Sequence, residues 1–249
     1  MQRERDDPVL LEEIRSADSP LVAKVRHARY RGAVREIAAP DGSWDLLFVR
    51  RGDSPWTVIQ TGQIAAPIAV ESQRGDEMLA IAFKPEVYMP RTPGRMTLNQ
   101  GLQRPLEGRR GFWIDGECFE IPDFENAEHL VAALVRKGLL ERDPVVALAL
   151  RGATQRLEER SVQRHFAEVT GLGLKTFQQI ERAQAAARLL REGQSPSQVA
   201  AALGFTDQAH LTHSLKRFLG ATPGQVIKAG GTHGDTWPVD GARNSQLAK

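Results

Sequence analysis

The sequence predicts an α+β protein, in which a β-rich part over residues 9–124 precedes an all-helical part over residues 126–228. In the first part, short apolar runs are broken by Gly, Pro and Asp, and no long helical pattern separates them. This arrangement is typical of a small barrel or a sandwich. From Asn126 onward, apolar residues recur instead with the period of an amphipathic helix. Residues 229–249 lose both periods and are rich in Gly, Thr, Asp and Asn, so we expect a disordered tail there.

Composition and charge narrow the class of protein. The 249 residues hold 33 Lys and Arg against 31 Asp and Glu, which gives a formal net charge of +2. The basic excess lies in residues 145–228, with 11 basic against 6 acidic side chains, as a phosphate-binding surface requires. No apolar run approaches the ~20 residues of a membrane span, and the charged first residues are unlike a signal peptide. A single cysteine excludes a disulfide framework, so we expect a cytoplasmic protein in a reducing compartment.

Candidate strands of the β-rich part are apolar runs of five to seven residues. They are Trp44–Val49, Trp56–Gln60, Ile64–Val70, Met78–Phe83 and the shorter Gly111–Ile114. The first follows Pro40-Asp41-Gly42, which combines the residues that tight turns favour. Residues 91–110 are rich in Gly, Pro, Arg and Gln, and we expect loop or irregular structure there.

The large aromatic residues of this part have two interpretations. They could line an effector pocket, since small-molecule sites are mostly apolar with a few polar groups. They could equally form the β core, and the sequence leaves both open. The residues concerned are Trp44, Trp56, Phe83, Tyr88 and Trp113.

We expect no enzyme, cofactor or metal site. Before residue 143 the histidines are His27 and His129, and neither has a partner at ligand spacing. No phosphate-cradling glycine loop and no Ser/His/Asp signature is present. Cys118 stands beside Phe119, which favours a small buried hydrophobe; a thiol redox sensor centred on Cys118 is the alternative.

The helical part begins with a series of amphipathic segments. Asn126 precedes the first, and Asp143 can cap the second, which runs to about residue 151. The third, Glu159–Thr170, places apolar residues at i, i+4 and i+7, and the polar segment before it has Leu157 as its only apolar anchor. A fourth helix, Lys175–Arg191, would span roughly 25 Å at 1.5 Å per residue.

The stretch Ser195–Pro223 predicts two short helices joined by a tight turn. Ser195 with Gln198 three residues later has the pattern of a capping box. Gly204 suits the end of the first helix, and Asp207 can cap the second. Apolar positions of the second helix recur at i, i+4, i+7 and i+8: Leu211, Leu215, Phe218 and Leu219. This is the pattern of a helix-turn-helix with a recognition helix.

The same stretch carries a family motif. It consists of Gly204, Phe205, Asp207, Gln208, His210, Leu211, Lys216, Arg217, Phe218, Gly220, Thr222, Pro223 and Gln225. These residues resemble the second helix-turn-helix of the AraC/XylS family of bacterial transcriptional regulators. Upstream, Ser161–Leu172 resembles that family's first recognition helix, and the resemblance covers roughly residues 143–228.

The resemblance implies a transcriptional regulator that binds double-stranded DNA through two helix-turn-helix units. It also implies an N-terminal β domain, cupin-like in many relatives, that binds an effector or mediates dimerisation. A small-molecule effector, a homodimer and RNA polymerase stay open as partners, and no membrane association is expected. A protein-interaction module is the alternative to DNA binding.

The outer faces of the two recognition helices supply the candidate DNA contacts. Arg can bridge O6 and N7 of guanine, and Gln can pair with adenine. The base-edge candidates are Arg160, Gln163, Arg164, Gln208, His210 and His213. The phosphate candidates are Ser161, Thr212, Ser214, Lys216 and Arg217. Alternatively, Arg160 and Arg164 form ion pairs with glutamates of their own helix, Glu159 or Glu168.

Overall fold

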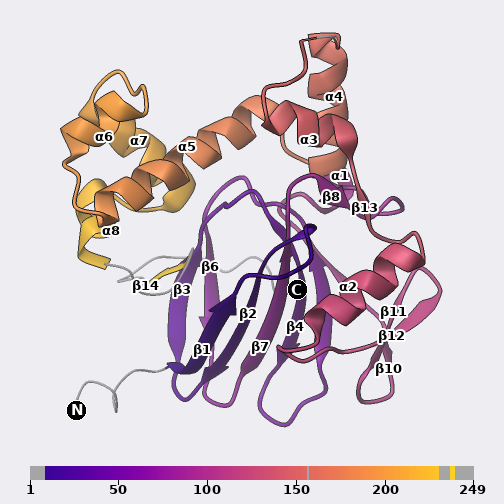
Figure 1. The fold of residues 1–249 in the computed structure, drawn as a ribbon. Helices are drawn as coiled ribbons and strands as arrows, with labels where there is room; N and C mark the ends of the chain where they lie inside the picture. The colour runs from indigo at the N-terminus through magenta and orange to yellow at the C-terminus, as the bar shows by residue number, and fades with distance from the viewer. Residues whose placement is uncertain (1–8, 156, 230–235, 239–249) are drawn as a thin grey trace. The chain divides into compact units, whose positions relative to one another are not determined.

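The computed structural model describes residues 9–155, 157–229 and 236–238, and it confirms the α+β class (Figure 1). Most strands precede the helices in the chain. The strands are β1 (Val9–Arg15), β2 (Val22–Tyr30), β3 (Val34–Ala38), β4 (Trp44–Arg50), β5 (Thr57–Thr61), β6 (Ile68–Ser72), β7 (Glu77–Phe83), β8 (Val87–Tyr88), β9 (Gly101–Arg104), β10 (Leu106–Glu107), β11 (Gly111–Ile114), β12 (Glu117–Glu120), β13 (Glu141–Arg142) and β14 (Thr236–Pro238). The helices are α1 (Gly94–Thr97), α2 (Ala127–Arg136), α3 (Pro144–Leu150), α4 (Glu159–Thr170), α5 (Leu174–Arg191), α6 (Pro196–Ala202), α7 (Gln208–Leu219) and α8 (Pro223–Ala229).

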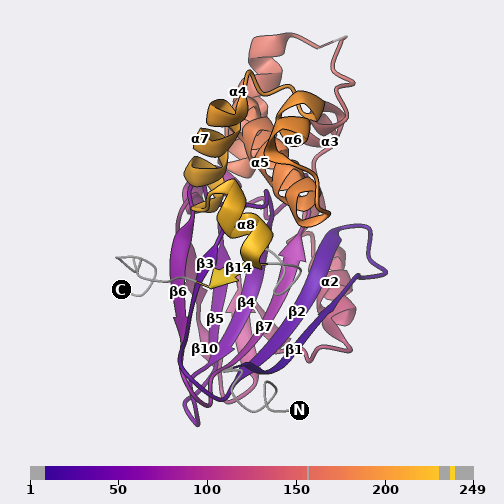
Figure 2. The same cartoon turned by 90° about the vertical axis from the view of Figure 1, so that its left-hand side faces the viewer.

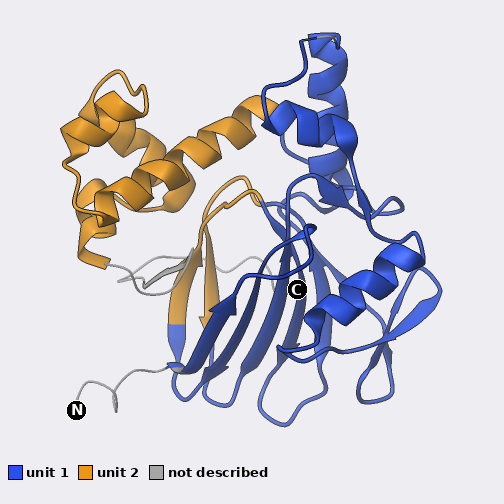
Figure 3. Ribbon diagram, in the orientation of Figure 1, with its two compact units in different colours: residues 1–34, 43–63, 72–173 blue, residues 35–42, 64–71, 174–249 orange. Residues whose placement is uncertain are grey.

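The chain divides into two compact units that do not follow the expected boundary at residues 124–126 (Figure 3). Unit 1 comprises residues 1–34, 43–63 and 72–173, and unit 2 comprises residues 35–42, 64–71 and 174–249. Helices α2, α3 and α4 therefore belong with the main sheet in unit 1. Most of β3 and β6 belong with the C-terminal helices in unit 2.

The main sheet of unit 1 is antiparallel and open. Its strand order is β1-β2-β7-β4-β5-β9, so that β1 and β9 form its two edges. Of the expected alternatives, a closed barrel is therefore wrong for the part of the chain that the structure describes. Strand β4 alternates buried and half-buried residues along its length, as a strand with one face on a core does.

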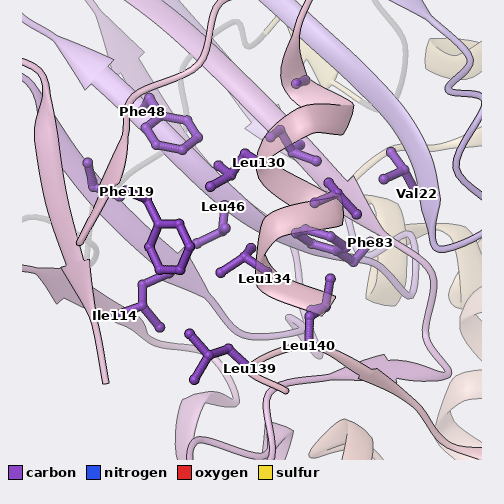
Figure 4. Packing of buried hydrophobic residues seen from close by; sticks show 14 of the residues in the cluster. Val22, Leu46, Phe48, Phe83, Ile114, Phe119, Leu130, Leu134, Leu139 and Leu140 are labelled. Atoms are coloured by element: carbon purple, nitrogen blue, oxygen red, sulfur yellow. The ribbon is translucent and has the colours of Figure 1, made fainter. Parts of the chain in front are cut away.

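The core of unit 1 lies between this sheet, α2 and the hairpin of β11 and β12 (Figure 4). Leu46 and Phe83 of the sheet and Leu134 of α2 are fully or almost fully buried there. Phe48 and Phe112 meet edge to face with ring centroids 5.5 Å apart. The apolar stripe expected after Asn126 is thus the face that α2 lays on the sheet.

Unit 2 gathers α6, α7 and α8 around α5 (Figure 2). The inward positions expected for α5, from Phe177 to Leu190, are buried. The turn after β3 packs on this helix: a Cβ on Gly42 would lie 2.5 Å from the Phe177 ring. Gln184 of α5 also donates a hydrogen bond to the Pro40 carbonyl at 2.6 Å.

Several elements differ from the sequence-based expectations. Within residues 91–110, expected as a loop, the structure has α1, β9 and β10. Strand β9 has no alternating apolar pattern in the sequence, because most of its side chains are exposed. Strand β6 starts at Ile68 instead of Ile64, since Pro67 has no N–H to give to a ladder. Strands β1 and β2 were not among the expected strands, because charged residues interrupt their apolar pattern. These charged residues pair across the two strands, as Arg26 does with Glu12 at 2.8 Å.

The expected disordered tail over residues 229–249 is only partly open to comparison. Residues 230–235 and 239–249 lie outside the described residues. Between them, Thr236–Pro238 form β14, which pairs antiparallel with β3. Those three residues therefore contradict the expectation.

Candidate nucleic-acid interface

The predicted first helix-turn-helix corresponds to α3 and α4, which pack against each other. Asp143 caps α3 as expected, because its side chain accepts a hydrogen bond from the Val146 N–H at 2.8 Å. Its second carboxylate oxygen lies 2.8 Å from Nε2 of His165 on α4. Asp143 is buried, so one residue both starts α3 and ties α4 to it. The sequence indicated the cap but gave no signal for the bond to His165.

The outer face of α4 presents the three predicted base-edge residues to solvent. Arg160, Gln163 and Arg164 are exposed, while Val162 and Phe166 are buried beneath them. The Gln163 amide donates to Glu159 of the same helix at 2.9 Å. Ser161 is half-buried and its hydroxyl donates to Glu158 at 2.8 Å.

The alternative of ion pairs within α4 is not seen in the described residues. Glu168 pairs with Arg95 of α1 instead, and Glu159 accepts the Gln163 amide. Arg164 also borders an open groove of about 430 Å³, whose walls include Val145 and Leu157. The Arg164 guanidinium is therefore on an accessible face, where a ligand can reach it.

The connection between α3 and α4 corrects one expectation. Leu157 was expected to anchor this segment, but its side chain is 43% exposed. The α4 cap at Glu158 has no side-chain hydrogen bond either. The helix is held instead by its buried face and by the bond from His165 to Asp143.

The second helix-turn-helix, α6 with α7, is confirmed at each local signal. Ser195 and Gln198 form the full capping box of α6. Asp207 caps α7 by accepting from the His210 N–H at 2.7 Å. Gly204 between the helices has φ +68°, a backbone conformation that side chains disfavour. The four apolar positions expected to face inward on α7 are all buried.

The outer face of α7 carries most of the predicted contacts. Its exposed residues include Gln208, His210, His213, Lys216 and Arg217. Thr212 is half-buried, and its hydroxyl donates to the Gln208 carbonyl at 2.8 Å.

Ser214 is the exception on α7, because its side chain is only 6% exposed. It stands three residues after Leu211 and four before Phe218, which places it on the inward face of the helix. The Ser214 hydroxyl therefore does not lie on the exposed face of α7, which leaves Ser214 out of the contacts proposed below.

The predicted effector pocket is not formed by the five aromatic residues. Trp44 and Phe83 are buried and stack with centroids 4.4 Å apart, and the Trp44 indole donates to the Val87 carbonyl. Trp56 lies under the Arg50 guanidinium at 5.0 Å, and the Trp113 indole donates to Glu107 at 2.8 Å. Trp44 and Phe83 belong to the core and Trp56 packs against it, as the alternative interpretation held. Trp113 alternates with the buried Phe112 and Ile114 and so lies on the other face of β11.

Tyr88 and Trp44 do border one void, which also touches Gln60 and Thr92. Its volume is about 10 Å³, room for a single water molecule. Burial, with the nearby Glu141 carboxylate, raises the pKa of the Tyr88 hydroxyl. This void is too small for an organic effector.

Cys118 is exposed on β12, not buried as its neighbours suggested. The strand alternation explains the difference, because Phe119 takes the inward position and leaves Cys118 on the outer face. Within the described ranges, no group of three or more His, Cys, Asp or Glu residues could hold a metal ion. Nor is any described helix both long enough and apolar enough to cross a membrane.

The comparisons with known proteins match the helical part. Residues 154–229 fit a family model described as a helix-turn-helix domain. The matched segment includes α4 through α8, and thus the predicted first recognition helix and the whole of the predicted second helix-turn-helix. No curated protein and no solved structure matches the chain. This family is one of DNA-binding regulatory domains and not of enzymes. Residues 154–229 thus form a helix-turn-helix domain of the AraC type, which supports a DNA-binding transcription regulator.

Proposed function

We propose that the protein reads double-stranded DNA with two recognition helices, α4 and α7, and that its β-rich part controls this reading. The observation that carries the proposal is that α4 and α7 are built in the same way. Each helix buries an apolar face on a supporting helix and leaves Arg, Gln, His or Lys exposed on the other. Helix-turn-helix proteins read base edges with such a face.

The exposed side chains divide by chemistry. Arg and Gln at the front of α4, with Gln208, His210 and His213 on α7, can pair with base edges in the major groove. Lys216 and Arg217 stand in the last turn of α7, where cations suit phosphate. The Ser161 and Thr212 hydroxyls are half-buried and complete the set of proposed phosphate contacts. Arg160, Gln163 and Arg164 are the proposed base contacts of α4.

The length of α5 supports the use of two grooves. At 18 residues it spans about 27 Å. Helix-turn-helix units that read successive major grooves stand one DNA turn apart, ~34 Å. A helix of this length between the two proposed helix-turn-helix pairs is compatible with one chain occupying two grooves on one face of the duplex.

Control by the β-rich part is supported by the contacts of α4 in unit 1 and of α5, on which α7 packs, in unit 2. In unit 1, α4 packs on α1 of the β-rich part, and Arg95 pairs with Glu168. In unit 2, α5 packs on the turn after β3 through Phe177 and Gln184. A small-molecule effector or a second copy of the chain that shifted these β elements would shift the recognition helices with them. Contact with RNA polymerase in the bacterial cytoplasm would complete such a regulator.

The first experiment is selection of bound genomic fragments by the full-length protein at two salt concentrations. We expect enriched fragments with a common motif, and an affinity that falls steeply as salt rises. Absence of any salt-dependent enrichment would contradict DNA binding and favour a protein-interaction module.

Two variants then separate base contacts from phosphate contacts. Arg164→Ala should relax the preference at one base position, losing discrimination of about 1–3 kcal/mol. Lys216→Ala should weaken binding to every sequence alike and reduce the salt slope by about one. If Arg164→Ala lowered the affinity for all sequences equally, Arg164 would be a phosphate contact instead.

A further inference from the structure

His210 is the base-edge candidate whose ring the structure defines in most detail. Its Nδ1 lies 3.3 Å from the backbone nitrogen of Thr206 and 3.3 Å from the Thr206 hydroxyl. The ring meets the Phe205 ring edge to face, with centroids 5.3 Å apart and an interplanar angle of 87°. His210 is the third residue of α7, and its side chain is exposed. The turn between α6 and α7 therefore fixes how this ring faces solvent.

The bond to Thr206 also decides where the imidazole carries its proton. A backbone N–H can only donate, so Nδ1 must accept with its lone pair. In a neutral imidazole whose Nδ1 accepts, the proton resides on Nε2. The ring thus presents an N–H donor at Nε2, on the side away from Thr206.

The surroundings of Phe205 keep this arrangement in place. Phe205 is buried, and the Arg182 guanidinium of α5 lies over its ring at 4.5 Å from the centroid. Asp207 holds the adjoining end of α7 by accepting from the His210 N–H. The ring is consequently held from two directions by parts of unit 2 that do not contact DNA in the proposed function.

We propose that His210 reads guanine through its Nε2–H and that Thr206 is the positioning residue that fixes this tautomer; the inference rests on the proposed function of α7. Guanine presents two acceptors, O6 and N7, side by side in the major groove. Adenine places an amino donor beside its N7, and cytosine presents an amino donor. These amino groups repel the Nε2–H of His210, which is also a donor. Thymine presents a single acceptor, O4, beside its methyl group. A donor-only ring at this position therefore favours guanine, which alone offers two adjacent acceptors in the major groove.

The tautomer can be measured without DNA. In the full-length protein at a pH where the ring is neutral, two-bond ¹H–¹⁵N spectra distinguish a protonated Nε2 from a protonated Nδ1. We expect His210 to show Nε2 protonated and Nδ1 unprotonated, with the signal assigned by its absence in His210→Ala. Thr206→Val keeps the backbone N–H and should keep this tautomer. A protonated Nδ1, or a mixture of the two forms, would overturn the proposal.

The reading of guanine is tested by substituting each base pair of a selected operator in turn. For the wild-type protein we expect one guanine whose replacement lowers affinity about threefold to tenfold, the effect of one hydrogen bond. In His210→Ala that preference should disappear. In His210→Gln it should shift toward adenine, because the Gln amide both donates and accepts. Ala202→Ser, a change at an exposed residue of α6 outside the Thr206 contact, should leave the preference at this guanine intact.

These outcomes distinguish the role of His210 from the proposed binding of DNA by the protein. A protein that binds its operator with the same base preferences in His210→Ala as in the wild type would overturn the role of His210 while leaving the proposed function standing. A preference for cytosine that depends on His210 would overturn the donor assignment, and a preference for adenine or thymine would overturn the reading of guanine. Failure to bind any DNA would overturn the proposed function, and with it the reading of guanine.

Discussion

Single residues in this protein join elements that are distant in the sequence. Asp143 caps α3 and also binds His165 of α4, so it sets both helices of the first unit. Glu77 of β7 does the same for the sheet, because it binds His27 at 3.0 Å, Arg29 at 3.0 Å, and Arg50. Each of these carboxylates brings partners from two elements to one point.

The pKa of Glu77 leads to a stability prediction. Burial by itself would raise this pKa, but the hydrogen bonds from His27 and Arg29 and the charges of Arg29 and Arg50 lower it overall. A carboxyl with a lowered pKa stabilises the fold above its unfolded-state value and loses that contribution as pH falls through its folded-state value. Glu77→Gln should therefore lower the free energy of unfolding at pH 7 by about 1–3 kcal/mol.

Urea unfolding at several pH values checks this prediction. The difference between Glu77→Gln and the wild type should shrink as pH falls below the pKa of the unfolded state, about 4.3 for a glutamate. Glu117→Gln is the matched control, since Glu117 forms an exposed bridge to Lys137 that should contribute at most ~1 kcal/mol. A difference that stayed constant down to pH 3 would contradict the ionised role of Glu77.

At the scale of elements, α1 is the part of the β-rich region that meets a recognition helix. A Cβ on Gly94 would lie 2.2 Å from the carbonyl carbon of Thr170, at the end of α4. Gly171, which ends α4 with φ +82°, faces the Gly94 carbonyl in turn. Two glycines thus allow the backbones of α1 and α4 to touch, and the Arg95–Glu168 pair lies beside this contact.

Gly94→Ala should force these backbones apart. Overpacking of this kind costs about 1–3 kcal/mol, and we expect a lower melting temperature together with weaker operator binding through α4. Gly173→Ala is the control, because a Cβ there meets nothing within 4 Å. Equal melting temperatures and affinities for the two variants would show that the close contact of α1 and α4 has no energetic role.

Elements with strong local signals could be predicted from the sequence, and those that depend on distant partners could not. The capping box at Ser195 and the apolar period of α7 involve residues within one or two turns, so the chain itself contains them. In contrast, α1 needs Gly94 only because Thr170 lies against it. The same contrast between local signals and other contacts decides which features of the candidate site could be predicted. The exposed faces of α4 and α7 followed from their periods, whereas the ring of His210 is set by a turn contact that periodicity does not encode.

At the scale of the whole molecule, the two proposed helix-turn-helix pairs belong to different compact units. The helices α3 and α4 share unit 1 with the main sheet, and α6 and α7 share unit 2 with most of β3 and β6. The segments 35–42 and 64–71 leave unit 1 and return to it, so the chain connects the units at several points. A sequence pattern could not reveal this division, because it depends on contacts such as Gly42 with Phe177 across more than a hundred residues.

The most direct test of the central claim is hydroxyl-radical footprinting of the full-length protein on its selected operator. We predict two protected stretches one helical turn apart on one face of the duplex, ~10 base pairs between centres. Arg164→Ala should weaken the protection of one stretch, and Gln208→Ala should weaken that of the other. Protection of a single groove that is unaffected by Arg164→Ala would contradict the account, since α4 would then be a helix that does not read DNA.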